Sequence, residues 1–267
     1  MWLIIIYAVS WWFVKTSIKP DIALARKLLG SDWGGAFADK ILNGYGEHED
    51  ELIRLEKLSR KIAPSLAILY AVGASFLAFD FVMTLDQEWF STLFGVFFIV
   101  GNMHAFLGLM LAISITVRSK FGMEEYITIN RLHDLAKMVF AFSLLWAYMG
   151  YSQYIVIWYA DIPEETPFLV IRSMEKPWSL MFLLIIICVF AIPFIGLLPK
   201  TLCRTPNYTR VMGIWVVLGQ WFAIYLMVVP SLQHYGHYHI YLGIHELLIT
   251  LGFAGLFFLS YLTFLGK

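Results

Sequence analysis

Long apolar runs restrict this chain to a helical membrane protein. Apolar windows of about 20 residues, the length an α-helix needs to cross the hydrocarbon core, fall at six places: 62–83, 92–117, 134–159, 178–199, 210–231 and 240–264. Residues 1–15 are also apolar and are expected to form a short or partial first span. Because backbone polar groups must be satisfied inside the membrane, the sequence predicts an all-α, polytopic transmembrane bundle of about seven spans.

Composition supports this class and excludes others. Hydrophobic residues make up 60% of the chain, charged residues 14%, and the mean hydropathy is +0.73, values outside the range of soluble domains. The formal net charge is zero, and basic residues gather only in loops beside spans, so no nucleic-acid partner is expected. Cys188 and Cys203 form no CxxC pair. We therefore expect no iron–sulfur cluster, structural zinc or covalent haem in this chain.

The distribution of lysine and arginine predicts the topology. Sixteen of these residues fall on one side of the predicted spans, and only Arg172 and Lys176 fall on the other. Cytoplasmic loops collect basic residues, so residues 16–61 and the C-terminus are expected in the cytoplasm. Within 16–61, the segment 48–64 predicts an amphipathic surface helix that stops where Pro64 opens the next span. The glycine-rich segment 31–46 predicts turns.

Polar groups at membrane depth are the candidates for chemistry, because hydrocarbon penalises them. His104 lies in the middle of the 92–117 span, where it either carries protons, holds a quinone, or is satisfied in helix packing. On the 134–159 helix, steps of about 100° per residue place several polar side chains on one face, a possible hydrated path: Asp134, Lys137, Tyr148, Ser152 and Tyr159. Alternatively, Asp134 and Lys137 form only an i, i+3 ion pair at the helix entrance.

Three further positions extend this hypothesis. Asp80 follows a long uncharged run and is the candidate buried carboxylate, with an interfacial role as the alternative. Gln220 lies midway along its span, as a ligand or as an interhelical hydrogen-bonding group. His245 and Glu246 open the last span and, with Asp80, would form an outer proton entrance. The complete predicted proton path is Asp80, His104, Asp134, Lys137, Tyr148, Ser152, Gln220, His245 and Glu246.

The outer loops carry two other patterns. His234, His237 and His239 resemble a metal site, but no clear fourth ligand accompanies them and interleaved aromatics are typical of an interfacial belt. No metal site is therefore predicted there. The loop 160–177 has an acidic turn and is expected to contact an extracytoplasmic partner.

The run HDLAKMVFAFSLLWAYMGYSQYIVIWYADIPEET at 133–166, with FDFVMTLDQEWFSTLFGVFF at 79–98, resembles a membrane subunit of bacterial alternative complex III, a quinol:electron-acceptor oxidoreductase. The similarity is to the second (ActF-type) of its two polysulfide-reductase-like, or NrfD-like, subunits. This resemblance implies a bacterial inner-membrane location, with a sister NrfD-like subunit, an iron–sulfur protein and multihaem cytochromes c as partners. Iron–sulfur clusters and c-type haems would lie in those partners, and quinone or quinol is a possible ligand.

The resemblance also implies a domain plan. Family members usually have about ten spans, so N-terminal spans are expected to be missing. Residues 62–133 would supply two spans of an incomplete first bundle, and 134–267 one four-helix bundle. The subunit would support a transmembrane proton path and complex assembly without a redox centre of its own, and whether it takes a catalytic part is open. The alternatives are a purely structural membrane anchor, a b-haem cytochrome anchor, which needs facing mid-membrane histidines, and a secondary transporter, for which no inverted repeat is found.

Overall fold

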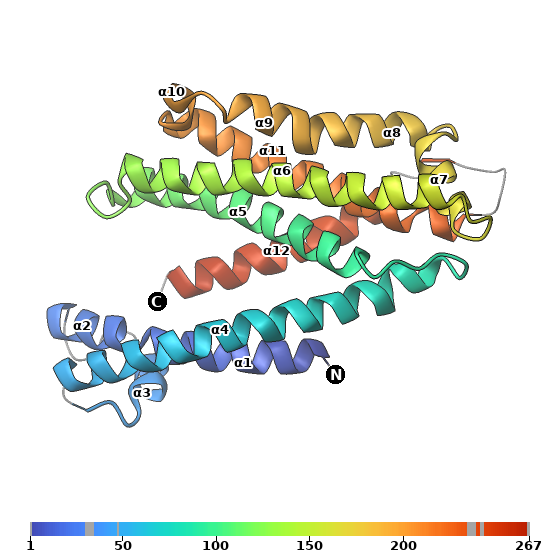
Figure 1. Cartoon of the computed structure of the whole chain (residues 1–267). Helices are drawn as coiled ribbons and strands as arrows, with labels where there is room; N and C mark the ends of the chain where they lie inside the picture. The colour runs from blue at the N-terminus through green and yellow to red at the C-terminus, as the bar shows by residue number, and fades with distance from the viewer. Residues whose placement is uncertain (1, 30–34, 47, 234–238, 241–242, 266–267) are drawn as a thin grey trace. The chain divides into compact units, whose positions relative to one another are not determined.

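The computed structural model describes residues 2–29, 35–46, 48–233, 239–240 and 243–265, and within these ranges the regular structure is helical without strands. Figure 1 shows the helices in chain order. Their bounds are α1 Trp2–Ser17, α2 Lys19–Leu29, α3 Gly35–Leu42, α4 His48–Phe81, η1 Met83–Leu85, α5 Phe94–Phe121, α6 Ile129–Ala160, α7 Thr166–Ser173, α8 Trp178–Ile185, η2 Ile186–Ala191, α9 Ile192–Gly196, α10 Lys200–Cys203, α11 Pro206–Val228, η3 Pro230–Leu232 and α12 Ile244–Leu265.

The prediction of an all-α polytopic membrane protein is confirmed. Six stretches in the described part of the chain are long and apolar enough to cross a membrane, and each contains or overlaps one of the six predicted windows. They are Glu49–Leu85, Phe94–Phe121, Ile129–Ala160, Trp178–Gly196, Pro206–Leu232 and Ile244–Thr263. The predicted short first span corresponds to α1, which has 16 residues.

The chain divides into two compact units, one formed by residues 1–73 and 241–267 and the other by 74–240. In the second unit, α11 packs along α5, α5 packs along α6, and the α8–η2–α9 helix completes a four-helix bundle. The predicted bundle over 134–267 stays a prediction, because its last span, α12, belongs to the first unit, and α5 is part of the bundle in the second unit. Span order alone did not show which apolar helices pack together.

Local sequence signals explain where the bundle helices begin and end. Gly122 adopts a left-handed conformation with φ of 64° and ends α5, which glycine does without a Cβ clash. The Thr128 side chain accepts the Arg131 N–H and caps the start of α6. Asp161, with φ of 47°, ends α6. The long helices are therefore set by their own caps, and their apolar faces form the core between them.

A π-helical turn, η2, interrupts the α8–α9 span just before Pro193. Proline has no N–H, so it cannot donate to the Val189 carbonyl, its partner in a regular α-helix. The Ser143 hydroxyl on α6 donates to that carbonyl at 2.9 Å. The Trp215 indole on α11 donates to the neighbouring Cys188 carbonyl at 3.1 Å. Two helices of the bundle thus satisfy the irregular backbone that the π turn exposes.

The first unit corrects two sequence-based expectations. Pro64 does not end a surface helix, because α4 runs through it for 34 residues. Pro64 has no N–H to donate to the Arg60 carbonyl. Arg60 is exposed, so water can donate to this carbonyl instead. The segment 31–46 is not all turns, since α3 forms over Gly35–Leu42 and buries Ala38 and Ile41 against Ile22 of α2. Burial of these side chains outweighs the turn preference of the surrounding glycines.

Candidate functional site

The centre of the bundle holds a buried histidine–glutamine pair. His104 on α5 and Gln220 on α11 are 0% and 2% exposed. The Gln220 Nε2 lies 3.0 Å from His104 Nδ1. An amide nitrogen can only donate, so Nδ1 accepts and the neutral imidazole carries its proton on Nε2. Among the described residues, Nε2 has no hydrogen-bond partner.

Glycines bring the two helices close enough for this pair to form. A Cβ on Gly108 would lie 2.8 Å from the Gly213 carbonyl oxygen, and a Cβ on Gly213 would clash with the Gly108 carbonyl. Gly101 and Gly108 flank His104 at helical spacing, so the three share one face of α5. Such stripes of small residues are the usual basis of close contact between membrane helices.

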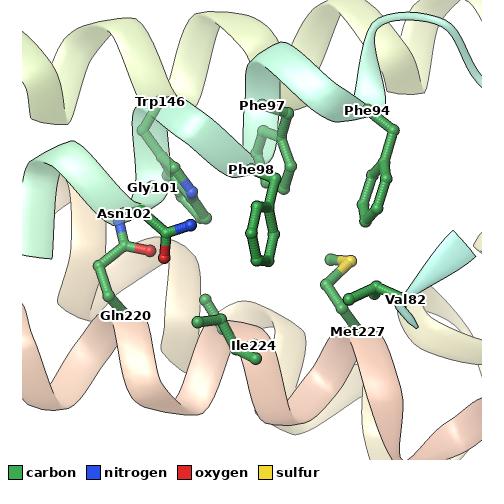
Figure 2. Close-up of a pocket in the computed structure, with 11 residues that line it drawn as sticks. Val82, Phe94, Phe97, Phe98, Gly101, Asn102, Trp146, Gln220, Ile224 and Met227 are labelled. Carbon is green, nitrogen blue, oxygen red and sulfur yellow. The ribbon is translucent and has the colours of Figure 1, made fainter. Parts of the chain in front are cut away.

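A small cavity lies beside Gln220, one member of the pair (Figure 2). Its volume is about 20 Å³, which is room for a single water molecule. Amides stand at one end of the cavity, from Asn102 and Gln220, and apolar groups at the other, including Phe94, Val82 and Met227. The cavity therefore has room for water next to Gln220.

The polar stripe of α6 points away from the interior of its unit. Asp134 and Lys137 form an ion pair at 2.7 Å with both side chains exposed, as the alternative interpretation predicted. Tyr148 is 61% exposed, and the Ser152 hydroxyl donates to the Tyr148 carbonyl at 2.8 Å, within its own helix. The face was correctly grouped, but it does not line a path inside this bundle.

The residues of the predicted outer proton entrance are divided between the two units, with Asp80 in the second and His245 and Glu246 in the first. Asp80 has an exposed side chain at the end of α4, so the expectation that it is a buried carboxylate is wrong. His245 is exposed at the start of α12. The Glu246 carboxylate accepts the Gly243 N–H at 2.9 Å, the usual role of an acidic residue in the first turn of a helix. Of the nine predicted path residues, His104 and Gln220 are in contact across two helices. Asp134 with Lys137 and Tyr148 with Ser152 are in contact only along α6.

Arg172 is a feature that the sequence alone did not reveal. It is 2% exposed and donates to the carbonyls of Leu226 and Met227 at the end of α11 and to the Ser231 hydroxyl, at 3.2, 2.9 and 2.6 Å. Its guanidinium also lies 3.5 Å from the centre of the Phe168 ring. Its sequence signal is the position of an arginine directly after the apolar run 168–171, because a buried arginine needs hydrogen-bond partners.

Metal ions and bis-histidine haem each require particular side chains to lie close together. No group of three or more histidine, cysteine, aspartate or glutamate side chains close enough to hold a metal ion occurs in that part of the chain. His234 and His237 of the outer loop lie outside the described residues. His104 faces a glutamine rather than a second histidine, so the pairing that a bis-histidine haem requires is not formed at this site.

Comparison with known proteins identifies no family for this chain. No family model matches the sequence, and no curated protein matches it.

Proposed function

We propose that this chain is a membrane subunit of a bacterial quinol:electron-acceptor oxidoreductase of the alternative complex III type. In this proposal it lies in the inner membrane with its C-terminus in the cytoplasm, beside a sister NrfD-like subunit, an iron–sulfur protein and multihaem cytochromes c. The motif-bearing runs at 133–166 and 79–98 support this identity. The helical membrane architecture is consistent with it.

Within that complex, we propose that the His104–Gln220 pair is a protonatable site. The single observation that carries this proposal is a fully buried imidazole with one nitrogen bonded to an amide and the other without a partner in the described structure. An imidazole ring can take up and release a proton at its ring nitrogens. The cavity beside Gln220 has room for a water that would connect the pair to its surroundings.

The test is proton translocation by the whole complex in liposomes. His104→Gln is expected to preserve quinol:acceptor turnover and to lower the number of protons released per electron, because glutamine fills similar space but does not titrate. Lys137→Met is the matched control, since it removes an exposed charge on α6 and should change neither quantity. Subunit composition and haem content establish assembly before each assay. Unchanged proton release in assembled His104→Gln would refute the protonatable role.

A structural anchor is the second candidate, and the α6 stripe favours it. Its charged groups pair with each other and its serine bonds to its own helix, as expected of groups that stabilise a helix rather than conduct protons. If this alternative holds, His104→Gln and Gln220→Leu alter thermal stability of the complex while turnover and proton release both stay at wild-type values.

A further inference from the structure

The end of α1 carries residues that are typical of the membrane–water interface. Trp11 and Trp12, near the end of α1, are 52% and 47% exposed, and Lys15 follows in the last turn. Exposed tryptophans followed by a lysine are typical of a helix leaving the hydrocarbon core at the membrane–water interface. Only Ile18 separates α1 from α2. The second helix therefore starts at the depth of the lipid headgroups.

One face of α2 is already occupied by α3. Ile22 is buried with Ala38 and Ile41 of that helix. Arg26 donates to the Gly35 carbonyl at 3.1 Å and forms an ion pair with Asp39 at 2.7 Å. These contacts fix how α2 is rotated about its own axis, and so determine which side chains face away from α3.

The opposite face of α2 is apolar and uncovered. Leu24 and Leu28 are 45% and 74% exposed. They are four residues apart and so neighbours on one helix face, nearly opposite Ile22 and Arg26. The exposed Lys27 lies beside them. Asp21 shares their side of the helix but lies in its first turn, where a carboxylate is stabilised by the helix dipole and can stay at headgroup level.

We propose that α2 lies along the bilayer surface, with Leu24 and Leu28 inserted at the boundary between headgroups and acyl chains. The partner is phospholipid. A short helix with leucines on one side and lysine beside them is the pattern of interfacial membrane helices, and Lys15 and Lys27 can extend their ammonium groups to lipid phosphates while their stems stay on apolar surface. The tryptophans of α1 place this face at the right depth, and α3 anchors its rotation.

The experiment measures the surroundings of α2 in the full chain, reconstituted in lipid nanodiscs and also within the purified complex. In a background with Cys188→Ala and Cys203→Ala, single variants L24C and L28C carry a small fluorophore. Lys40→Cys is the control, because Lys40 is exposed on α3. Quenching is compared between phospholipid brominated near the carbonyl end of its acyl chains and aqueous iodide.

The proposal predicts that labels at 24 and 28 are quenched by brominated lipid at least about twofold more than the label at 40, and by iodide correspondingly less, as for groups buried about 5–10 Å into the interface. The same result is expected in the complex. Iodide quenching equal to that at position 40 would mean that α2 lies in water and would overturn the proposal. Labels shielded from both quenchers would also overturn it, by showing that a protein surface covers the leucines.

Discussion

The Ser143 hydroxyl on α6 donates to the Val189 carbonyl on η2, the carbonyl that Pro193 cannot serve. The bond ties the centre of one span to the irregular turn of another. Ser143 is fully buried, so water has no access from that side. In lipid, an unmade backbone bond carries its full desolvation cost.

We expect Ser143→Ala to destabilise the protein by about 1–3 kcal/mol, because the Val189 carbonyl loses a buried donor. The measurement is reversible unfolding in detergent with increasing denaturant. Ser152→Ala is the matched control, since that serine bonds only within its own helix, and it should shift stability by less than about 0.5 kcal/mol. Equal losses of unfolding free energy for the two substitutions would show that the Ser143 hydrogen bond contributes no more to stability than a bond within one helix.

The closest approach of α5 and α11 gives a second prediction. A Cβ at Gly213 would clash with the backbone carbonyl of Gly108, and backbone cannot move aside as a flexible side chain does. We expect Gly213→Ala to push the helices apart and cost about 1–3 kcal/mol, while lengthening the His104–Gln220 hydrogen bond. Thermal unfolding checks the first effect. Imidazole nitrogen chemical shifts of labelled His104 check the second.

Gly252→Ala on α12 is the control for that experiment. Nothing lies within 4 Å of a Cβ placed there, so the substitution only improves helix propensity, by up to about 1 kcal/mol. Should Gly213→Ala also be neutral or stabilising, the crossing distance between α5 and α11 would not be set by these glycines.

Hydropathy located the spans well, but it could not say which of them pack together. Apolar windows are decided by length and composition, so α5 and α12 look alike in sequence. In α5, Gly108 lies directly against Gly213 of α11 and allows the close contact between these helices. His104 and Gln220 were each recognised as polar groups at mid-depth, yet their pairing depends on rotation of two helices about their axes. The sequence signal for this pairing was the helical spacing of small residues around both positions, which indicates a close helix contact.

The polar face of α6 shows what helical periodicity cannot predict. Helical periodicity correctly placed Tyr148 and Ser152 on the same face as the Asp134–Lys137 ion pair. Periodicity does not say whether a polar face points into the bundle or away from it, because a membrane protein contacts lipid and partner subunits as well as its own core. The burial of Arg172 was not predictable for a related reason, since the carbonyls of Leu226 and Met227 to which it donates lie more than 50 residues away in the chain.

Arg172 gives a third prediction. Its guanidinium serves two terminal carbonyls of α11, and a cation at a helix C-terminus is also favoured by the helix dipole. We expect Arg172→Gln to lower stability by more than about 3 kcal/mol, because buried acceptors lose charged donors. Arg172→Lys should recover only part of the loss, since an ammonium cannot match the planar fork.

The same unfolding measurement compares these variants with Arg54→Gln. Arg54 is exposed and pairs with Glu51 one turn away, a surface interaction of at most about 1 kcal/mol. A loss at Arg172 no larger than that at Arg54 would contradict a role in holding the outer end of α11.

Cys203 gives a pH-dependent prediction. The thiol is 2% exposed and donates to the Leu197 carbonyl at 2.9 Å, and burial raises its pKa above the ordinary value of 9.0. The folded protein therefore keeps this proton at pH values where the unfolded chain releases it. By linkage, the stability contributed by the raised pKa is fully present below 9.0 and is lost as pH rises through the folded-state pKa.

Two measurements follow from that shift. Between about pH 8 and pH 10, wild type should lose more stability than Cys203→Ala, which lacks the titrating thiol. In addition, iodoacetamide should modify Cys203 in the folded protein much more slowly than an exposed thiol introduced as Lys40→Cys, because only the thiolate reacts. Parallel pH profiles for wild type and Cys203→Ala, or equally fast alkylation at the two positions, would mean that the thiol is neither buried nor held in its protonated form.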